Sequence, residues 1–298
     1  MIGVDVGGTK ILSGVADREG NVLTRNLVES PGTSEEDVLD AIDASVEAML
    51  DERVGAIGFG VPANLDRASG RILRATNLSL DDFDLAAHAR ARFGLPVGIE
   101  NDANAAALAE WELGAGKGLS TMVLLTLGTG VGGGIVLDGR PYRGWAEIGH
   151  MVVQPGGPPC QGNCHGRGHL EALVSGTAAE RIAQELWGPD AGAPTFVEHA
   201  RAGDEEALAQ LDEMADLLGA AIGSLANLFD PELVVVGGGF GEAAGDLLLE
   251  RAQAAARAEA LTPADSTLRV VSAELGVEAG LIGAGLVGFA ALDATQAA

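Results

Sequence analysis

The sequence predicts an α/β protein built from two similar halves. Short apolar runs typical of strands alternate along the chain with longer stretches whose apolar residues recur at helical spacing. A strand, a glycine turn with a threonine and a returning strand occur together at the N-terminus and again at residues 121–137. This restart divides the chain into an N-terminal and a C-terminal half.

Five apolar runs of the N-terminal half are predicted as strands: Ile2–Val6, Ile11–Ala16, Val22–Leu27, Val54–Val61 and Pro96–Glu100. The first three are joined by tight turns, which indicates an antiparallel start. A helix is expected to begin at residues 33–37, where acidic side chains fill the first turn. An alanine-rich helix is expected at residues 103–113. We expect an N-terminal lobe over residues 1–105.

The C-terminal half is predicted to open with a strand at Thr121–Leu127 and its hairpin partner at Gly132–Leu137. A long helix at Glu205–Phe229 precedes a further strand at Leu233–Val236. We expect this lobe to span residues 106–280 and to contain a loop at 150–171. A last helix, at residues 281–298, is expected to complete the N-terminal lobe.

The charge of the chain excludes several classes of function. Its 298 residues include 43 Asp and Glu against 18 Lys and Arg, a formal net charge of −25. Such a chain lacks the basic face that nucleic acids and anionic membranes require. A phosphorylated ligand remains compatible, because backbone amides and a metal ion can hold phosphate.

The cellular setting is also constrained by the sequence. The 2 cysteines are too few for a disulfide framework. The longest apolar runs are short and interrupted by glycine, and the N-terminus has no basic region before an apolar one. We therefore expect a soluble cytoplasmic protein without a membrane span or a signal peptide.

Three glycine-rich turns each follow a predicted strand: Gly7-Gly8-Thr9-Lys10, Gly128-Thr129-Gly130 and Gly237-Gly238-Gly239. A glycine at a strand end lets the backbone approach a ligand oxygen without a Cβ clash. Thr9 adds a hydroxyl, Lys10 adds a cation, and Asp5 could hold Mg²⁺ directly or through water. The first turn alone could be a type I′ hairpin and the second an ordinary glycine hairpin, but three glycine turns in one chain favour phosphate binding. The dinucleotide and Walker spacings of glycines are absent.

The first two glycine turns and their strands resemble the two phosphate loops of the sugar-kinase and actin-like ATPase superfamily. The chain most resembles the ROK family of bacterial sugar kinases, from Ile2 to about Gly288. The resemblance implies two RNase-H-like domains that flank an active-site cleft holding ATP and Mg²⁺. It implies that Gly7–Lys10 and Gly128–Gly130 face the β- and γ-phosphates and that Gly237–Gly239 packs against adenosine. It also implies a homodimer or a tetramer made of two dimers.

A candidate catalytic carboxylate follows the strand that ends at Glu100. Asp102 could accept the proton of a sugar hydroxyl during phosphoryl transfer, or it could simply cap the following helix. The resemblance to ROK kinases favours the base, with Asn101 as a sugar ligand. It implies further sugar contacts at Asn77, Glu147, His150 and Glu171.

The reaction that the resemblance implies is ATP-dependent phosphorylation of the 6-hydroxyl of glucose to give glucose 6-phosphate. Alternatives are another sugar, namely N-acetylmannosamine, N-acetylglucosamine, fructose or mannose, or polyphosphate as the donor. A non-catalytic sugar sensor or repressor is disfavoured. The first phosphate motif begins at residue 5, before which no DNA-binding helices fit, and the chain is acidic.

Potential metal ligands crowd into the loop at residues 150–171. The loop is rich in glycine and proline and has little apolar content, so a bound metal could order it. The alternative is an exposed loop with a chance pair of cysteines. These potential ligands are His150, Cys160, Cys164, His165 and His169.

The ROK pattern begins with Gly-His, followed by nine residues and then by two cysteines separated by a single residue. A third cysteine comes later, two positions before a glutamate. Here Cys160 matches, Cys164 comes two residues late, and His169 stands at the third cysteine position. The resemblance therefore implies a structural Zn²⁺ held by His150, Cys160, Cys164 and His169, with His165 as a competitor of His169. His150 could bind zinc through one nitrogen and a sugar hydroxyl through the other.

Overall fold

The computed structural model describes residues 1–30, 34–66, 69–75 and 78–297. It contains two compact units. The first consists of Met1–Leu113, Arg143–Trp145 and Glu278–Ala298, and the second of Gly114–Tyr142 and Ala146–Val277. The C-terminal helix thus belongs to the first unit, and the chain first leaves that unit after Leu113, where the sequence placed the change after residue 105.

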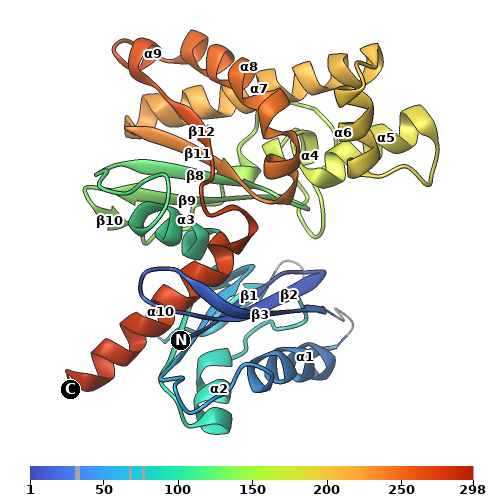
Figure 1. The fold of residues 1–298 in the computed structure, drawn as a ribbon. Helices are drawn as coiled ribbons and strands as arrows, with labels where there is room; N and C mark the ends of the chain where they lie inside the picture. The colour runs from blue at the N-terminus through green and yellow to red at the C-terminus, as the bar shows by residue number, and fades with distance from the viewer. Residues whose placement is uncertain (31–33, 67–68, 76–77, 298) are drawn as a thin grey trace. The chain divides into compact units, whose positions relative to one another are not determined.

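The first unit contains a five-stranded sheet in the order β3-β2-β1-β4-β7 (Figure 1). Its strands are β1 (Ile2–Val6), β2 (Lys10–Ala16), β3 (Val22–Glu29), β4 (Ile57–Val61) and β7 (Val97–Asn101). β1, β2 and β3 are antiparallel, whereas β4 and β7 run parallel to β1. The antiparallel start expected from the tight turns is therefore confirmed.

Four helices and a small hairpin complete the first unit. The helices are α1 (Glu35–Glu47), α2 (Leu85–Phe93), α3 (Asp102–Glu112) and α10 (Ala279–Gln296), and the hairpin strands are β5 (Ala63–Leu65) and β6 (Ile72–Ala75). The Oγ atom of Ser34 caps α1 by accepting from the backbone N–H of Asp37 at 3.1 Å. Thr33, which the sequence analysis included in this helix start, lies outside the described residues.

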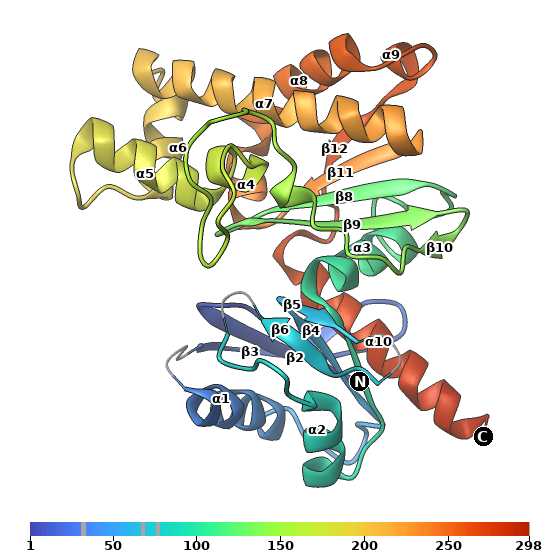
Figure 2. The ribbon, with the colours of Figure 1, turned by 180° about the vertical axis from the view of Figure 1, so that it is seen from behind.

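The second unit repeats the sheet of the first (Figure 2). Its strand order is β10-β9-β8-β11-β12. β8, β9 and β10 are antiparallel, and β11 and β12 run parallel to β8. The strands are β8 (Met122–Leu127), β9 (Val131–Leu137), β10 (Arg140–Pro141), β11 (Leu233–Gly237) and β12 (Val270–Ser272). The restart expected from the glycine turns therefore corresponds to a second copy of one topology.

Helices follow β10 and β11 in the second unit. They are α4 (Leu170–Leu173), α5 (Gly176–Trp187), α6 (Ala193–Arg201), α7 (Glu205–Phe229), α8 (Gly239–Glu259) and α9 (Ala264–Thr267), with short 3₁₀ turns η1 (Ile148–His150) and η2 (Gly276–Glu278). α7 and α8 lie side by side in both views (Figures 1 and 2). Gly219 on α7 lets the helices approach, because a Cβ there would meet Ala255 and the carbonyl of Ala252.

A row of glycines supports α10 on the sheet of the first unit. Gly3, Gly58 and Gly98 are register partners across β1, β4 and β7. A Cβ on any of them would overlap a backbone carbonyl oxygen of α10, so the helix lies directly on the strand backbones. The carbonyls concerned are those of Leu281, Ala284 and Val287.

The residues Gly276–Gln296 are long and apolar enough to cross a membrane by length and composition, with a mean hydropathy of 1.5 and 39% of that stretch buried. No membrane span was expected from the sequence. Residues 279–285 are buried in the first unit. The apolar composition of this part of α10 is therefore that of a core helix.

Replacement of Gly58 by alanine tests whether α10 packs directly on the strand backbones. The new Cβ would overlap the carbonyl oxygen of Ala284, which is backbone and cannot rotate away. We expect Gly58→Ala to lower the free energy of unfolding by about 1–3 kcal/mol or more, measured by urea denaturation. The control is Gly55→Ala, whose Cβ would lie 3.5 Å from side-chain atoms of Leu292 and Met1. Equal free energies of unfolding for the two variants would refute the direct contact between α10 and the backbone of β4.

Candidate functional site

Two carboxylates of the first unit lie at the same end of its parallel strands. Asp5 is on β1, Asp102 follows β7, and Gly60 of β4 lies between them. A Cβ on Gly60 would be 3.4 Å from the Cα of Asp102 and 3.9 Å from Oδ1 of Asp5. Burial, and then the negative charge of Asp102, raise the pKa of Asp5 to about 7. The pair therefore favours a proton or a cation at Asp5.

The helix that Asp102 begins is capped by its neighbour. Oδ1 of Asn101 accepts from the backbone N–H of Asn104 at 3.1 Å, and Asp102 is the first residue of α3. The alternative that Asp102 caps the helix is therefore wrong, and its role as the base stays a prediction. Nδ2 of Asn101 donates one of its two amide hydrogens to the carbonyl of Ala63 at 3.5 Å. Its contact with a sugar stays a prediction.

Glu100 holds the turn from β7 into α3, a function that the sequence analysis missed. Its Oε1 accepts from the backbone N–H of Asn101 at 3.0 Å and from Nδ2 of Asn104 at 3.1 Å. The two donors lie on either side of Asp102 in the chain. The bonds to Glu100 therefore fix the backbone that carries Asp102. An acidic residue one position before the end of the strand was the only sequence signal for this role.

The first glycine turn, between β1 and β2, has a geometry that excludes a type I′ hairpin. It contains three residues, and neither Gly7 nor Gly8 has the positive φ that both central residues of a type I′ turn need. Gly7 instead lets the backbone of Lys10 lie close to its own. Its N–H donates to the carbonyl of Lys10 at 2.8 Å, and a Cβ on Gly7 would lie 2.8 Å from that oxygen.

The second glycine turn joins β8 to β9. The N–H of Gly128 donates to the carbonyl of Gly130 at 2.9 Å. A Cβ on Gly130 would overlap the carboxylate of Glu171, whereas a Cβ on Gly128 would meet no atom within 4 Å. Gly130 therefore makes room for a protein group, and Gly128 leaves open space at the turn.

The third glycine turn connects β11 to α8. Gly238 has a φ of 82°, and a Cβ there would lie 2.6 Å from the carbonyl oxygen of Leu127. This glycine is therefore required by the fold itself. Gly239 has no atom within 4 Å of an added Cβ, and a contact of Gly237–Gly239 with adenosine stays a prediction.

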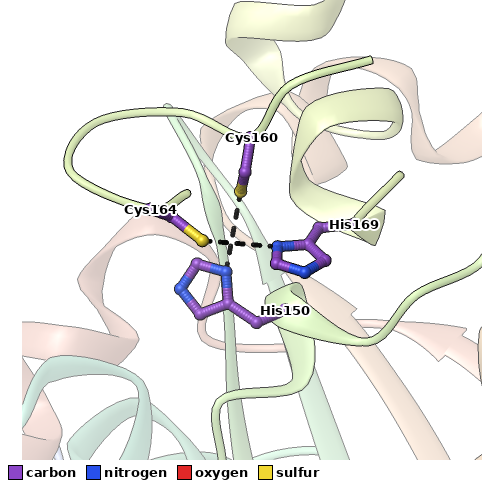
Figure 3. Close-up of side chains that lie close together, drawn as sticks. All are labelled: His150, Cys160, Cys164 and His169. Atoms are coloured by element: carbon purple, nitrogen blue, oxygen red, sulfur yellow. Dashed lines mark hydrogen bonds between the residues drawn. The ribbon is translucent and has the colours of Figure 1, made fainter. Parts of the chain in front are cut away.

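Four potential metal ligands of the second unit point toward one another (Figure 3). One ligand atom from each of His150, Cys160, Cys164 and His169 lies within 4.8 Å of all the others. Sγ of Cys160 is 3.7 Å from Nδ1 of His150, and Sγ of Cys164 is 3.6 Å from Nδ1 of His169. His165 is exposed and outside this group.

These separations suit a tetrahedral zinc ion. Zn–S bonds of about 2.3 Å and Zn–N bonds of about 2.0–2.1 Å place sulfur and nitrogen about 3.6 Å apart at the tetrahedral angle. Burial is the main cause that raises the pKa of the Cys160 thiol, to about 12. A bound cation would favour the thiolate instead, so loading the site would release protons.

The loop that carries the cluster is held by its own backbone. The N–H of Cys160 donates to the carbonyl of Gly166 at 3.0 Å, and the N–H of Gly166 donates to Sγ of Cys164 at 3.4 Å. Gly166 also lies against the ring of His169, where a Cβ would overlap the imidazole. The structural role of Gly166 was not predicted.

The remaining predicted sugar contacts have different environments. His150 turns Nδ1 toward the cluster, which leaves Nε2 for another partner. Glu171 is half-buried and accepts from the N–H of Val131 at 3.0 Å, and Glu147 is exposed before η1. Asn77 lies outside the described residues. Their contacts with a sugar stay predictions.

Residues 1–288 match the sequence pattern of the ROK family. The chain belongs to the ROK family. Among ROK-like relatives, it is 37% identical to the glucokinase of Streptomyces coelicolor and 35% identical to that of Thermotoga maritima, each over 95% of both chains. A crystal structure of a ROK family glucokinase from Streptomyces griseus, in complex with glucose and AMPPNP, matches with a TM-score of 0.89. It is 35% identical and covers 97% of this chain and 99% of that one. The resemblance to ROK proteins and the actin-like ATPase fold are thereby confirmed.

The raised pKa of Asp5 predicts a pH-dependent effect of Asp5→Asn. Between pH 4 and 7 the folded protein keeps a proton that the unfolded chain releases, so stability falls as the pH rises through this window. The asparagine removes this penalty. In buffer without metal or ligand, we expect a gain in the free energy of unfolding that is absent near pH 4 and reaches a few kcal/mol, at about 1.4 kcal/mol per pKa unit, near pH 7.

Urea unfolding of both proteins across this pH range measures the effect. Asp40→Asn, which alters an exposed carboxylate on α1, is the control for the loss of one negative charge. A gain from Asp5→Asn that does not change with pH would contradict the burial of the Asp5 charge.

Proposed function

We propose that the chain is an ATP-dependent glucokinase, which transfers the γ-phosphoryl group of ATP to the 6-hydroxyl of glucose and yields glucose 6-phosphate and ADP. The observation that carries the proposal is the place of Asp102. It begins α3 beside Asp5, a half-buried carboxylate with a raised pKa, in a chain similar throughout to ROK glucokinases. A carboxylate so placed is what an alcohol kinase needs as a base.

Asp102 accepts the proton of the 6-hydroxyl as that oxygen attacks the γ-phosphorus. The fixed turn from Glu100 to Asn104 holds the carboxylate in place, and Asn101 orients the sugar through its remaining amide hydrogen. Most of the catalysis comes from positioning and charge neutralisation, because phosphoryl transfer needs little covalent chemistry from the protein.

The phosphates are bound by the turns Gly7–Lys10 and Gly128–Gly130, and adenosine by Gly237–Gly239. Asp5 holds Mg²⁺, whose charge offsets that of the phosphate oxygens when it is bound. Its raised pKa supports this role, because a cation at Asp5 relieves both the cost of burial and the repulsion from Asp102. Lys10 and the hydroxyls of Thr9 and Thr129 complete the site.

The four ligands His150, Cys160, Cys164 and His169 hold one structural Zn²⁺. A full set of protein ligands leaves no open position for catalysis. His150 binds zinc through Nδ1 and a sugar hydroxyl through Nε2, which links the order of the loop to sugar binding. Asn77, Glu147 and Glu171 supply further sugar contacts. The enzyme works in the cytoplasm as a homodimer or a tetramer of two dimers.

A coupled kinase assay tests this function. The acceptors are glucose, mannose, fructose, N-acetylglucosamine and N-acetylmannosamine, and the donors are ATP and polyphosphate. We expect the highest kcat/KM with glucose and ATP. A higher kcat/KM with another sugar would make that sugar the acceptor. A higher kcat/KM with polyphosphate would make polyphosphate the donor. No transfer to any sugar would overturn the kinase assignment.

Asp102→Asn tests the catalytic base. The amide cannot accept the hydroxyl proton, so we expect kcat to fall by about 10²–10⁴-fold. Glucose binding, measured by calorimetry, is expected to persist because the amide still forms hydrogen bonds. Asp40→Asn on α1 is the matched control and should keep full turnover. Near-normal turnover of Asp102→Asn would rule out this base.

Elemental analysis of the purified protein tests the metal site. We expect about one zinc per chain in the wild-type protein, since four ligands saturate a tetrahedral ion. His169→Ala and Cys164→Ser should each lose most of it, whereas His165→Ala should keep it because His165 is exposed outside the cluster. Loss of zinc in His165→Ala, together with retention of zinc in His169→Ala, would show that His165 and not His169 is the fourth ligand.

A further inference from the structure

Gln161 lies between the two cysteines of the metal loop, residues 150–171, and reaches out of that loop. The residues Gln161–Cys164 form a turn, closed by a bond of 3.2 Å from the N–H of Cys164 to the carbonyl of Gln161. Gly162 takes the positive φ of 55° that this turn uses. The turn returns Cys164 to the cluster, while the side chain of Gln161 contacts the junction between α4 and α5.

The amide of Gln161 makes two hydrogen bonds at this junction. Its Nε2 donates to the backbone carbonyl of Glu171 at 2.9 Å and to Oγ of Ser175 at 2.8 Å. A carbonyl can only accept, so the amide nitrogen must face it. Ser175 is fully buried and caps α5 by accepting from the N–H of Ala178 at 3.1 Å. Gln161 therefore binds the group that fixes the start of α5.

The same junction holds the turn between β8 and β9. The N–H of Val131 donates to Oε2 of Glu171 at 3.0 Å. The N–H of Gly176 donates to the carbonyl of Gly128 at 2.7 Å, and Oγ1 of Thr177 donates to the carbonyl of Thr129 at 2.8 Å. Three bonds thus connect the segment 171–177 to the backbone of Gly128–Val131.

We propose that Gln161 is a positioning residue that links the metal loop to the Gly128–Val131 turn through the α4–α5 junction. Metal binding orders the loop, the ordered Gln161 fixes Glu171 and the cap of α5, and these hold the turn in the shape that binds phosphate. Metal loading therefore strengthens nucleotide binding. The inference rests on the proposed function, since it takes this turn as a phosphate loop.

The link also acts in the opposite direction. Two binding events that favour one conformation strengthen each other by the same factor. Bound nucleotide should therefore slow the loss of zinc to a chelator. The metal would then influence a turn to which its ligand Cys160 is also connected through Glu171, whose Oε1 lies 3.8 Å from the Cys160 Sγ.

Gln161→Met tests this role, because methionine keeps an unbranched side chain of similar length and removes the donor. Asn163→Met is the matched control, since Asn163 is exposed in the same turn. In zinc-loaded protein, we expect Gln161→Met to bind AMPPNP about 5- to 10-fold more weakly by calorimetry, in line with the loss of one or two net hydrogen bonds. Zinc content should stay within about twofold of wild type, as should both the zinc content and the AMPPNP affinity of Asn163→Met.

Amide hydrogen exchange gives a readout that does not depend on catalysis. We expect faster exchange at Gly128–Val131 in Gln161→Met and in wild-type protein stripped of zinc. If Gln161→Met does not fold, Thr177→Val removes a bond at the far end of the same link, and its exchange should rise at the same residues. AMPPNP should slow zinc loss to a chelator in wild type and much less in Gln161→Met.

The outcomes separate this inference from the proposed function. Wild-type nucleotide affinity and exchange in Gln161→Met would overturn the link and leave the kinase assignment intact. Absence of nucleotide binding in the wild-type protein would overturn the proposed function, while exchange at Gly128–Val131 would still report whether the metal orders the turn. Equal weakening by Asn163→Met would make the effect a general disturbance of the loop and refute the role of Gln161.

Discussion

The direct contact between α10 and the sheet of the first unit determines the environment of its carboxylates. Gly3, Gly58 and Gly98 bring the helix axis close to the strands, since any Cβ there would meet a helix carbonyl. The first turn of α10 then lies against Asp5, where a Cβ on Gly280 would overlap its carboxylate. This contact shields the half-buried Asp5 from water, and burial is the main cause of its raised pKa. A packing requirement of the fold thus becomes an electrostatic property of the site.

The second unit reaches local order by a different route. Its sheet and long helices form an apolar core, but the segment 150–171 has few apolar side chains to add to it. In the proposed zinc site, ligand atoms of two cysteines and two histidines, all within 4.8 Å of one another, take the place of that core. A loop that a few metal bonds hold in place can fix other segments only through side chains that contact them. Single hydrogen bonds, such as the two made by Gln161, therefore matter more here than in a packed core.

The sequence was informative where the signal was local and periodic. The helix Glu205–Phe229 and the strand Ile2–Val6 have the predicted bounds, because apolar spacing alone defines them. The hairpin β5–β6 and the helix α2 were missed, since both are short and depend on tertiary contacts. Spacing brought the cysteines and histidines to one loop but could not choose between His165 and His169. Gln161 carried no signal, because only the fold brings it near the carbonyl of Glu171 and Oγ of Ser175. Glu100 carried only its acidic character, which does not by itself indicate bonds to Asn101 and Asn104.

The net charge of −25 and a phosphate site are compatible because the proposed site relies little on cationic side chains. Backbone N–H groups carry partial positive charge at no cost in net charge, and glycine allows a phosphate to approach them. An acidic protein would still repel a nucleotide if its nearest carboxylates were ionised. Burial, and then the negative charge of Asp102, raise the pKa of Asp5 to about 7, which favours a proton or a cation at this carboxylate. In the proposed site that cation is Mg²⁺, and Asp102 is the carboxylate proposed as the base.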